Sequence, residues 1–170
     1  MTLHKKTILA MFLALLVLLG VAIHSWSSKS PLLVTPQVVP QRPDPLWSAI
    51  DRGGSLDEVR RLVEARPTYV TEKIYGATAL YYAVARNEAD AARFLLGRGA
   101  DPDARVEAGG DGEGNTPMIA AVENRNTAMV NLLCQYHADL NVRDKYGRSL
   151  MELAADSPEM KRLLAAKNVH

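Results

Sequence analysis

The chain has 170 residues, of which 48% are hydrophobic and 23% are charged, a composition typical of a globular domain. Its 20 Lys and Arg nearly balance its 19 Asp and Glu. No clustered basic face is evident, which argues against nucleic acid as a partner. Cys134 is the only cysteine, so an internal disulfide is excluded, and Cys134 with His137 lacks the second ligand pair of a zinc site. We expect Cys134 to be a buried, inert thiol.

The first predicted element is an apolar segment near the N-terminus. Two lysines precede the uncharged run Ile8 to Ile23, a pattern that directs a chain to a membrane. Gly20 and Ala22 have the small-residue spacing of a signal-peptidase site, whereas Trp26 stands where an aromatic residue would hold an anchor at the interface. Residues 1–26 are therefore predicted to be a signal anchor or a cleavable signal peptide. Both alternatives export the rest of the chain.

A proline-rich segment follows the apolar run. Residues 27–45 contain five prolines, which fix φ, remove amide donors and prevent helix formation. The segment is predicted to be an extended linker. At about 3.1 Å per residue it could hold a domain up to roughly 60 Å from a membrane.

From residue 46 onward the chain repeats itself. Residues 76–105, "GATALYYAVARNEADAARFLLGRGADPDAR", align without a gap with residues 114–143, "GNTPMIAAVENRNTAMVNLLCQYHADLNVR". A further copy begins at Asp144, where Ser149 follows Thr116 by 33 residues. Each copy holds two amphipathic helical stretches that can bury their apolar faces only against the next copy. The repeat therefore predicts an elongated solenoid with nearest-neighbour contacts.

These copies resemble the ankyrin repeat. The stretches "GATALYYA", "GNTPMIAA" and "GRSLMELA" follow the family pattern Gly-x-Thr-Pro-Leu-His-x-Ala, and "GADPD" and "HADLN" follow its closing Gly-Ala-Asp-x-Asn. Residues from Leu46 to Glu72 form a diverged first copy. The resemblance implies an all-α ankyrin solenoid of about four helix-turn-helix repeats spanning residues 46–170. The expected repeats are 44–72, 73–105, 111–143 and 144–170, with an insertion at 106–110.

Several positions carry a local structural prediction. Thr78, Thr116 and Ser149 are expected to cap the first helix of their repeats, and Pro117 fits the first helical turn. His137 replaces the glycine expected in a left-handed conformation after the second helix. The residues expected to face the core are Leu46, Leu80, Met118 and Met151 on inner helices and Val59, Ala92, Val130 and Met160 on outer helices.

The glycine-rich window "AGGDGEGNTP" (residues 108–117) is the remaining unusual motif. It lacks the lysine of a phosphate-binding loop, since Asn115 stands at that place. It also lacks the sixth-position glycine and twelfth-position acid of a calcium loop. Residues 101–113 hold five acids and one arginine, a local net charge of −4. The window is therefore predicted to be a flexible acidic loop, either inert or acting as a contact arm for a basic partner.

No catalytic, cofactor or metal-binding motif is present in the sequence, so we expect no enzymatic activity, no cofactor and no metal. Ankyrin domains bind proteins, and the resemblance implies contact through the hairpin tips and the exposed side of the inner helices. Tyr75 and Tyr146 stand out as anchors, although either could instead pack against a neighbouring hairpin. The candidate partner-binding residues are Tyr75, Arg86, Glu107, Asp111, Glu113, Asn115, Glu123, Asn124, Tyr146 and Arg148.

The leader and the repeats together predict a monomeric binding domain of a bacterial protein. We expect a single-pass inner-membrane protein with the ankyrin domain in the periplasm, or a soluble periplasmic protein after signal cleavage. The expected partner is another protein, which an immunity-type factor would bind or inhibit. The alternatives are a scaffold for a periplasmic enzyme that handles oxidants, and a structural envelope protein without a partner.

Overall fold

The computed structural model describes residues 44–110 and 112–167. The predicted apolar helix, almost all of the proline-rich linker, and Asp111 lie outside these residues. The described part of the chain holds eight α-helices, one short 3-10 helix and one two-stranded sheet. In chain order they are α2 (Pro45–Asp51), α3 (Leu56–Ala65), η1 (Pro67–Val70), β1 (Lys73–Ile74), β2 (Ala77–Thr78), α4 (Ala79–Ala85), α5 (Ala89–Gly97), α6 (Pro117–Glu123), α7 (Thr127–Gln135), α8 (Leu150–Leu153) and α9 (Pro158–Lys167).

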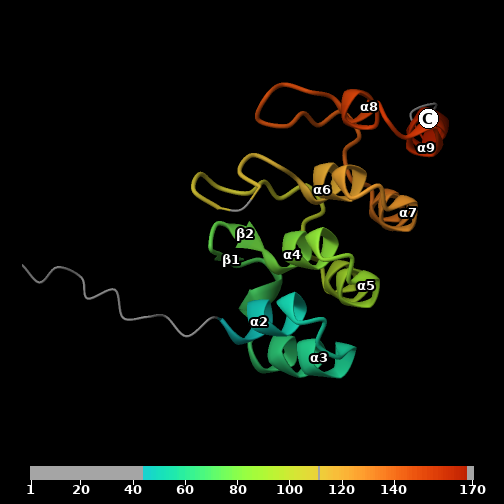
Figure 1. The fold of residues 1–170 in the computed structure, drawn as a ribbon. Coiled ribbons are helices and arrows are strands. Elements are labelled where there is room, and N and C mark those ends of the chain that lie inside the picture. Colours follow the sequence, from blue (N-terminus) through green and yellow to red (C-terminus); the bar gives the residue numbers. More distant parts are fainter. Residues whose placement is uncertain (1–43, 111, 168–170) are drawn as a thin grey trace, which may run out of the picture. The chain divides into compact units, whose positions relative to one another are not determined.

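The helices form a two-layer stack (Figure 1). The inner helices α2, α4, α6 and α8 pack against one another in that order, and each packs against the outer helix that follows it. The loops that precede α4, α6 and α8 project together on the side away from the outer helices. The predicted helical solenoid is confirmed.

The inner helices begin at capping residues, as expected. The side-chain oxygens of Thr78, Thr116 and Ser149 accept backbone N–H bonds three residues on, at 3.3, 3.4 and 3.4 Å. Pro117 occupies the first turn of α6, where its missing N–H leaves no bond unmade. Asp44 caps α2 by accepting the N–H of Leu46 at 2.9 Å. Such caps stabilise a helix by about 1 kcal/mol each.

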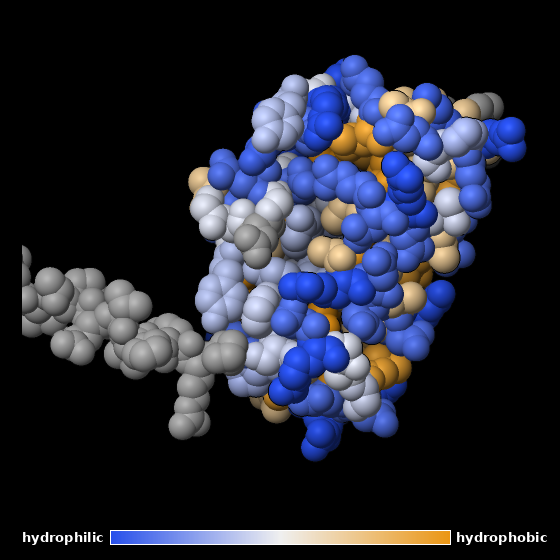
Figure 2. Space-filling model, viewed as in Figure 1, coloured by the Kyte–Doolittle hydropathy of each residue, from blue (hydrophilic) through white to orange (hydrophobic). Residues whose placement is uncertain are grey.

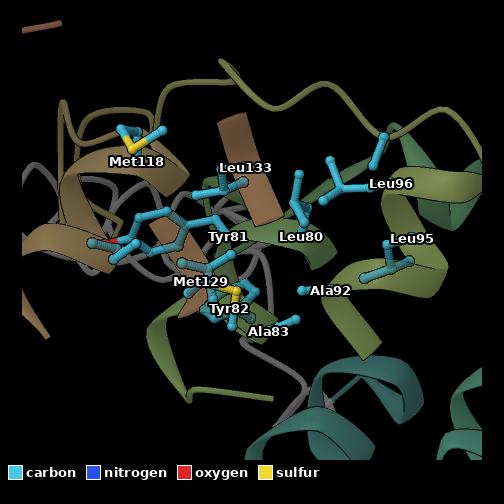
Figure 3. Close-up of a cluster of buried hydrophobic side chains, with 14 of the residues drawn as sticks. Leu80, Tyr81, Tyr82, Ala83, Ala92, Leu95, Leu96, Met118, Met129 and Leu133 are labelled. Atoms are coloured by element: carbon cyan, nitrogen blue, oxygen red, sulfur yellow. The ribbon is translucent and has the colours of Figure 1, made fainter. Parts of the chain in front are cut away.

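The core runs between the two helix layers. Figure 3 shows side chains of α4, α5, α6 and α7 gathered in one cluster, with Leu80, Leu95, Met118 and Leu133 completely buried. Three of the four expected inner-helix positions are confirmed, but the prediction for Met151 is wrong. Its side chain is 40% exposed, and the neighbouring Leu150 is buried instead. The reason is positional: within the described residues, no further inner helix packs on α8.

Left-handed residues recur at fixed places in the repeats. The turns from inner to outer helix contain Gly53, Asn87 and Arg125, with φ of 64°, 63° and 55°. The outer helices α5 and α7 are followed by Gly99 and His137, with φ of 88° and 60°. The predicted left-handed role of His137 is therefore confirmed. Non-glycine residues hold this conformation at a modest energetic cost.

The all-α expectation is incomplete at one point. Strands β1 and β2 form an antiparallel hairpin that pairs Lys73 with Thr78 and Ile74 with Ala77. The turn residues Tyr75 and Gly76 both have positive φ, 53° and 83°, as a type I′ turn requires. Each strand has only two residues, too few to show an alternating pattern in the sequence.

Candidate protein-binding surface

Three loops form one edge of the described domain, and we call them fingers. Finger 2 comprises residues 73–78, finger 3 residues 106–110 and 112–115, and finger 4 residues 143–149. They project side by side from the inner-helix layer (Figure 1). At the equivalent tip position the fingers carry Tyr75, Glu113 and Tyr146 respectively, each followed by a glycine.

The described residues of finger 3 make hydrogen bonds within the finger and to finger 2. The N–H of Glu107 donates to the carbonyl of Gly76 in finger 2 at 2.8 Å. Val106 and Asn115 close the base of finger 3, where the Val106 N–H donates to the Asn115 carbonyl at 3.0 Å, and Val106 is buried. The Lys73 ammonium lies 3.0 Å from the Glu107 carboxylate. These contacts fasten finger 3 to finger 2.

The glycines of finger 3 permit close packing. A Cβ at Gly110 would lie 2.8 Å from the carbonyl oxygen of Tyr75 in finger 2. A Cβ at Gly112, whose φ is 78°, would overlap the hydroxyl of Tyr81 on α4. The glycine-rich window thus lets the finger lie against finger 2 and the inner helix. The sequence showed the glycines but not the surfaces that approach them.

Aromatic side chains of one inner helix support the finger of the next repeat. Trp47 and Tyr81 occupy the same position of α2 and α4, three residues after the capping residue. Trp47 meets Tyr75 of finger 2 edge to face, with ring centroids 5.7 Å apart, and Tyr81 lies beneath Gly112 of finger 3. The Tyr82 hydroxyl donates to the Ile74 carbonyl at 3.0 Å and ties finger 2 to α4.

A cleft opens between fingers 2 and 3. It has a volume of about 330 Å³ and is lined by Trp47, Tyr75, Tyr82, Gly109 and Gly110, which we call the aromatic cleft. Sequence reasoning identified Tyr75 but missed Trp47 and Tyr82. Laying α2 over α4 would have placed Trp47 beside finger 2, because Trp47 and Tyr81 hold equivalent positions.

The remaining polar candidates form a row, with Arg86, Glu123 and Asn124 at the C-terminal ends of α4 and α6 and Arg148 in finger 4. Arg86 pairs with Asp51 of α2, and Asn124 donates to the Ala85 carbonyl at 2.9 Å. Arg148 lies 3.9 Å from Glu123. Each contact joins two successive repeats. Four candidate residues therefore connect successive repeats and also present polar groups at the surface: Arg86, Glu123, Asn124 and Arg148.

Asn115 has a different environment from the other candidates. Its side chain is buried, and its amide nitrogen donates to the Glu123 carboxylate at 3.2 Å. This bond fixes the base of finger 3 on α6. Glu107 and Glu113 remain on the outer part of finger 3, where Glu113 accepts the N–H of Gly109 at 3.3 Å. Asp111, the remaining acidic candidate, lies outside the described residues.

Finger 4 is held by a buried carboxylate. Asp144 accepts the backbone N–H groups of Tyr146 and Arg148 at 2.9 and 2.8 Å and the Arg148 Nε–H at 2.7 Å. Burial raises the pKa of Asp144, but these hydrogen bonds and the Arg148 charge outweigh burial and leave the pKa below its ordinary value. The finger presents Tyr146, which is 72% exposed, with the Lys145 ammonium and the Arg148 guanidinium 5.3 and 5.4 Å from its ring centre.

Other chemical groups are few in the described part of the chain. Across residues 44–110 and 112–167, no three His, Cys, Asp or Glu side chains gather as metal ligands would. Cys134 is half-buried, and burial raises the pKa of its thiol, with a smaller opposing effect from Lys167. In the same ranges, every helix is too short or too polar to cross a membrane.

The fold and the fingers define a stack of helical repeats with a projecting hairpin edge. Two family models match the chain: "Ankyrin repeats (many copies)" at residues 106–154 and "Ankyrin repeats (3 copies)" at residues 16–106. The second covers more than half of the sequence. The chain belongs to the ankyrin-repeat family.

Curated relatives agree with this assignment. The chain is 29% identical over 113 residues to BRCA1-associated RING domain protein 1 of Caenorhabditis elegans, a match that covers 66% of this chain and 15% of the relative. It is 33% identical over 105 residues to Neurogenic locus notch homolog protein 1 of Xenopus laevis, covering 61% and 4%. Identity to Ankyrin repeat and SOCS box protein 11 of Mus musculus is 28% over 122 residues, covering 71% and 35%. The match spans well under two thirds of each relative.

Proposed function

We propose that the chain is a protein-binding module whose partner contacts fingers 2 and 4 and the row of polar residues on the inner helices. The observation that carries this proposal is the pair of tyrosines at the finger tips. Tyr75 is 51% exposed and Tyr146 is 72% exposed, on fingers that project from the same edge. Exposed tyrosines are frequent anchors of protein interfaces, and ankyrin repeats are generic protein-interaction modules.

We further propose that the module is displayed in the bacterial periplasm. This part of the proposal rests on the sequence of residues 1–26, in which an uncharged run follows two lysines. An uncleaved run would keep the domain on the inner membrane, and cleavage after Ala22 would release it. The relatives are eukaryotic proteins and provide no support for this location. Mass spectrometry of the mature N-terminus distinguishes the two forms, because a chain that starts at Ile23 is not tethered.

An immunity-type role, in which the module binds or inhibits an exported protein, is our first choice of biological role. The alternative is a scaffold that supports a periplasmic enzyme such as one that handles oxidants. The identity of the bound protein separates these roles. A protein without any partner would instead be a structural component of the envelope.

Affinity capture tests the binding surface. The full chain, tagged at its C-terminus and solubilised in detergent, is expected to recover one dominant protein from envelope extract. The double variant Tyr75→Ala with Tyr146→Ala should recover much less of it. Met151→Ala serves as the matched control, because Met151 is an exposed hydrophobic residue on α8 rather than on a finger tip. Equal recovery by the double variant and the control would contradict the proposed surface.

A further inference from the structure

We propose that the aromatic cleft binds an extended proline-rich segment that carries a basic side chain and belongs to the partner protein. This inference rests on the proposed function and specifies the chemistry of the partner. Its first support is the arrangement of the rings. Trp47 meets Tyr75 at an interplanar angle of 75° and Tyr82 at 87°, so the exposed Tyr75 ring and the partly buried Trp47 ring pack edge to face over the buried Tyr82 ring. Polyproline helices dock into open, aromatic-lined grooves of this kind.

Hydrogen-bond donors in the cleft supply the second support. Among the described residues, the indole N–H of Trp47 and the hydroxyl of Tyr75 have no hydrogen-bond partner; Tyr75 is half exposed, and Trp47 is partly buried. The Tyr82 hydroxyl, by contrast, donates to Ile74. A polyproline helix has no internal hydrogen bonds, so its carbonyl groups need external donors. Trp47 and Tyr75 offer a donor next to an apolar ring face, which suits such a segment.

The backbone of Tyr75 supplies the third support. Its φ of 53° is unusual for a bulky side chain, and a glycine or asparagine would fit the turn with less strain. Neither Glu113 nor Tyr146, the equivalent tip residues, has a positive φ. Residues held in a strained conformation tend to occur at binding sites. Here the strained turn holds the Tyr75 ring against Trp47, at the wall of the cleft.

Charge complementarity selects a basic ligand. The described residues of finger 3 include two acids, Glu107 and Glu113, and no basic residue. Both acids flank the Gly109 and Gly110 wall of the aromatic cleft. The Glu107 side chain is 62% exposed although the Lys73 ammonium lies beside its carboxylate. An arginine or lysine next to the proline segment would therefore meet negative charge at the rim.

The test monitors the indole N–H resonance of Trp47 by NMR. The full chain contains two tryptophans, so Trp26→Phe leaves Trp47 as the only indole. The ¹⁵N-labelled variant in detergent micelles is titrated with a peptide of one arginine followed by seven prolines. We expect a saturable shift of the Trp47 indole resonance. A peptide of one arginine followed by glycine and serine, with the same length and charge, should cause no shift at the same concentration.

Single substitutions test whether the peptide binds in the aromatic cleft. Tyr75→Ala is expected to weaken binding of the arginine–proline peptide about tenfold. Met151→Ala removes an exposed hydrophobic side chain on α8, outside the cleft, and should leave the dissociation constant unchanged. Glu113→Gln should weaken binding of the arginine–proline peptide a few-fold but leave an alanine–proline peptide of the same length unaffected, because only the charge contact is lost.

Three results would overturn the inference. They are the absence of a Trp47 shift, an equal shift with the glycine–serine peptide, and an equal shift with tetramethylammonium. The last result would identify an ammonium site instead. Failure of the proline-rich ligand proposal can be told apart from failure of the proposed binding function. If the partner is still captured through Tyr75 and Tyr146 while the peptide leaves Trp47 unmoved, the binding module stands and the proline-rich ligand does not.

Discussion

Fingers 2 and 4 end in the same residue type but hold it in different ways. Tyr75 of finger 2 packs on Trp47, and finger 3 is fastened alongside. In the described part of the chain, the Tyr146 ring of finger 4 lies beside the cations of Lys145 and Arg148, on a turn hydrogen-bonded to Asp144. One tyrosine packs against another aromatic ring, and the other lies largely in solvent beside two cations. Equivalent positions of a repeat can therefore offer a partner two kinds of contact.

The largest loss of stability is expected when the Asp144 carboxylate, which holds the turn of finger 4, is removed. Asp144→Ala leaves three N–H groups without their acceptor and should lower the free energy of unfolding by about 3 kcal/mol. Urea denaturation measures this loss. Ser149→Ala is a useful reference, because it removes only a helix cap and should cost about 1 kcal/mol. Equal losses would mean that the Asp144 network contributes little.

The same carboxylate predicts a pH dependence. The pKa of Asp144 is lower in the folded protein than its ordinary value. Its contribution to stability is therefore complete above the unfolded pKa of about 3.9 and is lost as pH falls through the folded pKa. Below about pH 4, the difference in unfolding free energy between wild type and Asp144→Asn should shrink with falling pH. A difference that stays constant down to pH 2 would contradict the assigned pKa direction.

The next largest loss of stability is expected when a side chain is added to a closely packed glycine of finger 3. Gly112→Ala combines a positive φ with a clash against the Tyr81 hydroxyl and should destabilise the domain by about 2 kcal/mol. Gly109→Ala has the same kind of backbone conformation but open space around the added Cβ, so it should cost about 1 kcal/mol. Thermal unfolding compares them. If the two variants are equally stable, finger 3 does not lie against α4 as described.

The tip tyrosines should differ in stability as they differ in packing. Tyr75→Ala removes an edge-to-face contact with Trp47 and should cost about 1 kcal/mol. Tyr146→Ala should change the unfolding free energy by less than about 0.5 kcal/mol, because its ring is largely in solvent. Chemical denaturation of both variants checks the comparison. A larger loss for Tyr146→Ala would reverse it.

The smallest effect concerns a turn outside the fingers. Arg125 has a φ of 55° at the place that Gly53 fills in the first repeat. Arg125→Gly should therefore stabilise the domain by about 0.5 kcal/mol, because glycine adopts this conformation without a Cβ clash. A raised thermal midpoint would support this account. Gly53→Ala is the reverse change and should lower the midpoint.

The sequence predicted the repeat architecture well because each repeat carries its own local signals. The caps at Thr78, Thr116 and Ser149 and the left-handed His137 depend on backbone geometry within one repeat. The misplacement of Met151 shows the limit of this reasoning. Its helix position is equivalent to that of Met118, but its burial depends on whether another inner helix covers it.

The candidate site was less predictable because it is assembled across repeats. The aromatic cleft draws Trp47 from α2, Tyr75 from finger 2 and glycines from the insertion in finger 3. Composition indicated an acidic loop, but it did not indicate the backbone hydrogen bonds and the Lys73 contact that join the described residues of that loop to finger 2. At the other end of the stack, hydrophobic surface is visible near α8 (Figure 2). A hollow of about 180 Å³ there is lined by apolar residues such as Leu140, Leu150 and Met151 and by polar ones such as Asn141 and Arg143. That surface also follows from position in the stack rather than from residue type.

The most direct test of the finger-edge account is the affinity of the purified partner for the full chain. Isothermal titration would compare the wild-type chain with the double variant Tyr75→Ala and Tyr146→Ala, with Met151→Ala as the control. We predict a dissociation constant raised at least about tenfold in the double variant and unchanged in the control. Equal dissociation constants for the wild type and the double variant would contradict the claim that the finger tips carry the interaction.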